Sequence, residues 1–141
     1  MIAGLLISPC RGRVRFVFRL HEDCAVDGPK AAAFLRQVGL AVDGPIFVVW
    51  DRLNAHRSKC VRAFVARRTR FHLEFLPPYA PDLNPVEYAW CWLKTNPLAN
   101  YAPKDAAELA QAARGQGYRL KRKQPMLWSF IEHSPLSLRH K

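Results

Sequence analysis

The 141-residue chain lacks several features that would place it in a familiar class of protein. No apolar run approaches the roughly 18 residues that a membrane-spanning helix needs. The apolar start at residues 1–7 has no basic segment before it, so it does not resemble a signal peptide. The four cysteines are scattered and form no Cys-x-x-Cys pair. We therefore expect neither a structural zinc site nor a disulfide framework, and the reducing cytoplasm is the favoured location.

Acidic residues are also scarce. The chain has 22 Lys and Arg against 11 Asp and Glu, which gives a net charge of +11 and a pI of about 10.1. A basic excess of this size favours a polyanionic partner, and nucleic acid is the first candidate. Half of the residues are hydrophobic, so the chain can still bury a real core.

The pattern of apolar residues predicts alternating strands and helices. Residues 2–8 and 13–20 predict an antiparallel hairpin, because the second run alternates apolar and basic side chains. Residues 46–50 are all apolar, which predicts a strand buried on both faces in a partly parallel sheet. The other expected elements are helices at 30–39, 56–68, 85–96 and 103–114, a strand at 71–76, a Pro-rich loop at 77–85, a Gly-rich basic loop at 115–125 and a helical turn at 126–131. This order favours an α/β fold.

Two acidic residues stand where chemistry commonly occurs. Asp51 directly follows the apolar strand, and ligand sites in α/β sheets lie beyond the carboxyl ends of strands. It could equally be a loop residue or the N-cap of the next helix. Glu87 lies two residues into the helix that begins at Pro85, where it could instead close a capping box with Asn84. If the two carboxylates converge, they could bind Mg²⁺, which prefers carboxylate oxygens and phosphate.

Two longer motifs identify a family resemblance. The segments FVVWDRLNAHRS, at residues 47–58, and LPPYAPDLNPVEYAWCWLK, at residues 76–94, resemble the DDE transposases of the IS630/Tc1/mariner superfamily, and the IS630-type branch most of all. The 35 residues between Asp51 and Glu87 fit the spacing in that family. The likeness covers roughly residues 1–135 and is looser outside residues 46–94.

The resemblance implies an RNase H-like mixed sheet flanked by helices, and cutting and joining of DNA that depends on Mg²⁺ or Mn²⁺. Asp51 matches the second aspartate of the family triad and Glu87 matches its final acid, so both are the expected catalytic and metal-binding residues. Asn54, His56 and Asn84 match polar residues that support them. We expect residues 1–97 to form a partial catalytic domain and residues 98–141 a helical, basic extension that packs on it.

The chain also departs from the family pattern. Arg52 stands where the family usually has Asn, and a cation there could compete with a metal or point outward. The opening strand and its aspartate are expected to be missing, because residues 2–8 and 13–20 match the second and third strands. A chain without one triad carboxylate is expected to be inactive alone. An upstream transposase half could supply that strand, or the chain could act as a homo-oligomer.

The cations after Asp51 form the expected DNA-binding set, although they could also be only a solvated helix face. The set is Arg57, Lys59, Arg62, Arg67 and Arg68. The expected function is thus that of a transposase catalytic-domain fragment acting on transposon terminal inverted repeats and target DNA in the bacterial nucleoid. The alternative is a non-catalytic DNA-binding remnant or regulator with the same fold.

Overall fold

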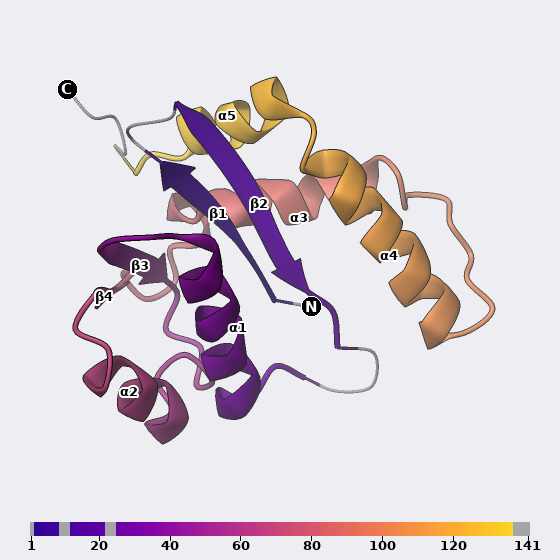
Figure 1. The fold of residues 1–141 in the computed structure, drawn as a ribbon. Coiled ribbons are helices and arrows are strands. Elements are labelled where there is room, and N and C mark those ends of the chain that lie inside the picture. The colour runs from indigo at the N-terminus through magenta and orange to yellow at the C-terminus, as the bar shows by residue number, and fades with distance from the viewer. Residues whose placement is uncertain (1, 9–11, 22–24, 137–141) are drawn as a thin grey trace. The chain divides into compact units, whose positions relative to one another are not determined.

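The computed structural model describes residues 2–8, 12–21 and 25–136, which form two compact units (Figure 1). Of the described residues, unit 1 comprises 3–8, 12–21 and 82–136, and unit 2 comprises 25–81 together with Ile2, the first residue of the first strand. Unit 1 holds strands β1 (Ile2–Ser8) and β2 (Arg13–Arg19) and helices α3 (Pro85–Thr95), α4 (Ala106–Leu120) and α5 (Gln124–His133). Unit 2 holds helix α1 (Gly28–Ala41), strand β3 (Ile46–Trp50), helix α2 (Lys59–Ala66) and strand β4 (Phe71–Phe75). A 3-10 turn, η2 (Pro81–Leu83), joins them.

The strands form two pairs. Strands β1 and β2 are antiparallel neighbours in unit 1 (Figure 1). Strands β3 and β4 are parallel neighbours in unit 2. Small antiparallel and parallel sheets flanked by helices confirm the predicted α/β class and are consistent with an RNase H-like domain. The turn predicted between β1 and β2 lies mostly outside the described residues.

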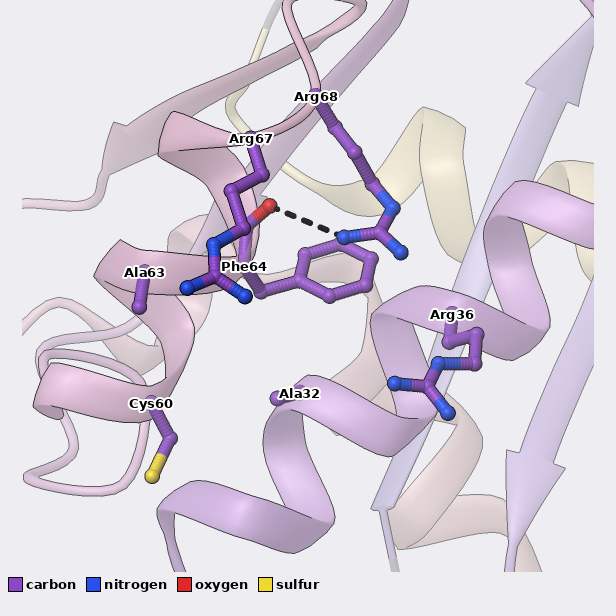
Figure 2. A pocket seen from close by; sticks show the side chains of 7 residues that line it. All are labelled: Ala32, Arg36, Cys60, Ala63, Phe64, Arg67 and Arg68. Atoms are coloured by element: carbon purple, nitrogen blue, oxygen red, sulfur yellow. Dashed lines mark hydrogen bonds between the residues drawn. The ribbon is translucent and has the colours of Figure 1, made fainter.

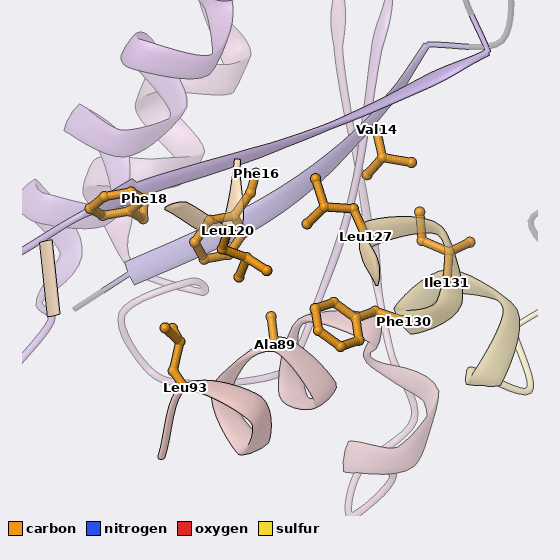
Figure 3. Close-up of a cluster of buried hydrophobic side chains, with 9 residues drawn as sticks. All are labelled: Val14, Phe16, Phe18, Ala89, Leu93, Leu120, Leu127, Phe130 and Ile131. Carbon is orange, nitrogen blue, oxygen red and sulfur yellow. The ribbon is translucent and has the colours of Figure 1, made fainter. Parts of the chain in front are cut away.

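The core of unit 1 joins the two ends of the chain. Strand β2 turns Val14, Phe16 and Phe18 inward and its arginines outward, as the alternating pattern predicts. These side chains pack against helices α3, α4 and α5 in one apolar cluster (Figure 3). The cluster consists of Val14, Phe16, Phe18, Ala89, Leu93, Leu120, Leu127, Phe130 and Ile131.

The prediction of a loop at residues 115–125 was wrong. Helix α4 continues to Leu120 and α5 begins at Gln124, so the predicted single turn at 126–131 is a longer helix. The reason is Gly117, whose Cα lies so close to Phe18 that an added Cβ would be 2.5 Å from its ring. This glycine therefore serves helix packing and does not end the helix. The predicted boundary at residue 97 stays a prediction.

The prediction that strand β3 is buried on both faces was also wrong. Ile46 and Trp50 are buried, but Phe47 is 71% exposed and Val49 is 42% exposed. The strand pairs with β4 in the register Ile46 to Phe71. A run of five apolar residues cannot reveal whether both faces of the strand are covered, and here the described chain covers only one.

Candidate active site

The Asp51 carboxylate is held at the end of strand β3 by a local turn. Its Oδ1 accepts hydrogen bonds from the backbone N–H of Leu53, at 3.0 Å, and from Nδ1 of His56, at 2.6 Å. The N-cap of α2 is Ser58, whose hydroxyl accepts from the Val61 N–H at 3.3 Å, so the interpretation of Asp51 as a helix cap was wrong. The Asp51 side chain is 51% exposed, and its Oδ2 has no hydrogen-bond partner among the described residues. The half-exposed carboxylate is therefore accessible to a ligand.

His56 is fixed by an aromatic neighbour. Its ring lies flat on Trp50, with 4.1 Å between ring centroids and 5° between planes. Only 11% of the His56 side chain is exposed. Stacking therefore orients the imidazole while Nδ1 donates to Asp51. The family resemblance implies a supporting role for His56, but it does not indicate Trp50, for which the only sequence signal is its place directly before Asp51.

Arg52 is held away from Asp51. Its Nε donates to the carbonyl of Leu76 at 3.1 Å, and the Leu76 N–H donates to the carbonyl of Trp50 at 2.9 Å. These bonds tie together the segments that follow the two parallel strands. In the part of the chain that the structure describes, Arg52 forms no ion pair with Asp51. The departure from the family pattern thus leaves the carboxylate free of a guanidinium partner.

Glu87 lies in the first turn of α3. Asn84 is the N-cap, because its Oδ1 accepts from the Val86 N–H at 3.2 Å. The Glu87 N–H donates to the Asn84 carbonyl at 3.0 Å, but the Glu87 carboxylate makes no hydrogen bond or ion pair within the described ranges. The predicted Asn84 cap is therefore confirmed. The second hydrogen bond of a capping box, from the Asn84 N–H to the Glu87 carboxylate, is not formed. Glu87 is exposed and available to a ligand.

The two carboxylates belong to different units, Asp51 to unit 2 and Glu87 to unit 1. Both are accessible, and both supply the hard oxygen ligands that Mg²⁺ and Mn²⁺ accept, so their chemistry fits such an ion. Among the residues that the structure describes, no group of three or more His, Cys, Asp and Glu side chains is placed to hold a metal. A metal shared by Asp51 and Glu87 stays a prediction.

The remaining predicted residues lie on the surface. Asn54 is exposed in the turn after Asp51. All members of the predicted DNA-binding set are exposed too: Arg57, Lys59, Arg62, Arg67 and Arg68. Their contact with DNA stays a prediction. None of the described helices is long and apolar enough to cross a bilayer.

Comparison with known proteins assigns the family. The family described as DDE superfamily endonuclease matches residues 6–110, well over half of the chain, and the match includes Asp51 and Glu87. No curated protein and no solved structure matches the chain significantly. The chain belongs to the DDE superfamily endonuclease family.

Proposed function

We propose that this chain is part of the catalytic domain of an IS630-type transposase, which cuts and joins DNA strands with Mg²⁺ or Mn²⁺. Domains of this family are transposase-like nucleases that bind DNA and generally use divalent metals. The observation that carries the proposal is the half-exposed Asp51 carboxylate at a strand end, whose Oδ1 is held by Leu53 and His56 while Oδ2 has no hydrogen-bond partner among the described residues. The net charge of +11 supports a role on DNA in the nucleoid.

Each residue in the proposal has a separate task. Asp51 and Glu87 bind the metal, which would supply Lewis-acid stabilisation of charge at the attacked phosphorus. His56 orients Asp51 through its hydrogen bond. Asn84 starts α3 and thereby positions Glu87 on the first turn. Asn54 lies in the turn beside Asp51 and is proposed to contact the substrate.

The active site is proposed to need one more carboxylate. A strand that bears an aspartate and pairs with the edge of β3 opposite β4 would bring that group beside Asp51, because β3 has only β4 as a neighbour among the described strands. An upstream transposase half, or a second copy of the chain, is the proposed source. Alone, the chain is proposed to be inactive because two carboxylates do not fix the metal geometry.

The alternative function is a DNA-binding remnant or regulator without catalysis. The observation that favours it is the set of exposed cations after Asp51. Such a protein would bind DNA in the same way and cut none.

The test is nicking of DNA that carries the terminal repeats, with Mn²⁺, by the chain alone and by the chain co-expressed with the upstream reading frame. We expect nicking only in the co-expressed sample, and a loss of about 100-fold or more in Asp51→Ala and Glu87→Ala. Asp43→Ala, which removes an exposed acid outside the motifs, is the control. Equal nicking by the wild type and by Asp51→Ala would contradict the proposed enzymatic function. DNA binding without nicking in every sample would establish the alternative.

A further inference from the structure

A basic groove lies between helices α1 and α2 in unit 2 (Figure 2). It has a volume of about 520 Å³. Helix α1 contributes Ala32 and Arg36, α2 contributes Ala63 and Phe64, and Arg67 and Arg68 follow directly after α2. The two alanines leave the space open, because a larger side chain at either position would extend into it.

The floor and one wall of the groove are fixed. Phe64 is buried and forms the apolar floor. The guanidinium of Arg68 lies 4.1 Å from the centre of the Phe64 ring, and its Nη1 donates to the Phe64 carbonyl at 3.4 Å. Arg68 is therefore held by the protein itself and contributes a positively charged wall.

Arg36 and Arg67 are the uncompensated cations of the groove. Both are exposed, and within the described residues neither side chain has an ion-pair or hydrogen-bond partner. Helices α1 and α2 contain no acidic residue at all. Arg67 caps the C-terminal end of α2, where the helix dipole favours a cation, but this explanation does not apply to Arg36 in the middle of α1.

We propose that this groove binds the phosphodiester backbone of DNA, with Arg36 on α1 and Arg67 at the C-terminal end of α2 both donating to phosphate oxygens. Guanidinium groups suit this task because they present paired donors to phosphate. The inference rests on the proposed function and deepens it, since it adds Arg36, which the sequence pattern did not indicate.

The geometry also divides the DNA-binding set predicted from the sequence. Groove residues Cys60, Ala63, Phe64 and Arg67 follow the spacing of a single helix face. Arg62 does not lie on that stripe and faces another side of α2. The groove therefore assigns phosphate contact to Arg67 and Arg36, and it gives Arg62 no part.

The test measures the affinity of the full chain for a mixed-sequence DNA duplex by fluorescence anisotropy over a series of salt concentrations. For Arg36→Gln/Arg67→Gln we expect the affinity for DNA to fall about tenfold or more. We also expect the plot of the logarithm of the association constant against the logarithm of the salt concentration to become less steep, by about two units of slope. The control, Arg13→Gln/Arg15→Gln, removes the same charge from exposed positions of β2 and is expected to keep the wild-type slope. Circular dichroism verifies that both variants fold.

A third variant tests the groove without removing an arginine. Ala63→Glu places a carboxylate among the groove cations and is expected to weaken DNA binding as well. An unchanged salt slope in Arg36→Gln/Arg67→Gln, or an equal loss of DNA affinity in the β2 control, would overturn the proposal that the groove binds DNA. Neither result would contradict the proposed function on DNA. A wild-type chain with no salt-dependent DNA binding would overturn both.

Discussion

His56 connects a buried aromatic ring to an exposed acid. Its ring lies on Trp50, and its Nδ1 lies 2.6 Å from Asp51 Oδ1. Stacked rings stabilise by about 0.5–1.5 kcal/mol beyond simple burial. This small cluster therefore fixes the Asp51 carboxylate before any ligand arrives.

Replacing His56 tests that cluster. We expect His56→Ala to lower the free energy of unfolding by about 1 kcal/mol, because it removes the stacking contact. His56→Phe keeps an aromatic ring on Trp50 and is expected to recover most of the loss. Urea unfolding followed by tryptophan fluorescence measures both. Equal stability of His56→Ala and wild type would show that the ring contact contributes nothing.

The ends of several elements follow from signals close to them in the sequence. Strand β3 occupies Ile46–Trp50 as predicted, because a turn precedes it and its residues are apolar. Helix α3 begins at Pro85 after its Asn84 cap, also as predicted. The end of α4 could not be predicted in this way. Gly117 lies inside the helix because the position has no room for a Cβ beside the ring of Phe18, and Phe18 is distant in the sequence.

Two glycines of α4 make a matched pair for this explanation. An added Cβ at Gly117 would meet Phe18, whereas one at Gly115 would meet nothing within 4 Å. We expect Gly115→Ala to raise the free energy of unfolding by about 0.5–1 kcal/mol, since alanine favours a helix. Gly117→Ala is expected to lower it despite that preference. Thermal unfolding of both variants checks the signs, and a stabilised Gly117→Ala would refute the packing role.

The cap of α1 predicts a dependence of stability on pH. The Lys30 N–H donates to Asp27 Oδ1 at 2.9 Å, and this bond lowers the pKa of Asp27 below its ordinary value. A lowered pKa in the folded state means that the carboxylate stabilises the fold above about pH 4, and that this contribution disappears as the pH falls through the folded pKa.

Urea midpoints at two pH values measure this contribution. We expect Asp27→Ala to be less stable than wild type at pH 7, and the difference to shrink at pH 3. Asp43→Ala, at an acid without a hydrogen-bond partner in the described chain, is the comparison and is expected to show no such change. A difference for Asp27→Ala that stays constant with pH would contradict the charged cap.

At the scale of the molecule, the C-terminal helices complete the core that the N-terminal hairpin begins. Gln124 illustrates this, because its side-chain amide donates to the Val14 carbonyl at 2.8 Å and its Oε1 accepts from the Val14 N–H at 3.2 Å. Leu120 and Leu127 are fully buried in the same cluster. The sequence predicted a loop at 115–125 and only a helical turn at 126–131, because the partner strand of these helices lies at the other end of the chain and no local pattern indicates it.

A pair of leucines tests this closure. Leu127 is fully buried in α5, while Leu109 in α4 is 43% exposed. We expect Leu127→Ala to lower the free energy of unfolding by about 2–5 kcal/mol, because it leaves a cavity in the core. Leu109→Ala is expected to cost much less. Similar losses in chemical denaturation would contradict a core shared by the two ends.

The candidate site shows the same limit of prediction. The motifs identify Asp51 and Glu87 individually, and the structure gives each an accessible carboxylate at the end of a strand or the start of a helix. Asp51 belongs to unit 2 and Glu87 to unit 1, so no pattern local to either motif encodes the proposed shared site. We propose that the two side chains bind one metal ion.

Paramagnetic broadening by Mn²⁺ in the NMR spectrum of the full chain tests this proposal. We expect amide signals around Asp51 and around Glu87 to broaden with the same titration midpoint, and Asp51→Asn to remove the broadening at both places. Independent midpoints, or broadening near Glu87 that survives Asp51→Asn, would contradict a shared metal.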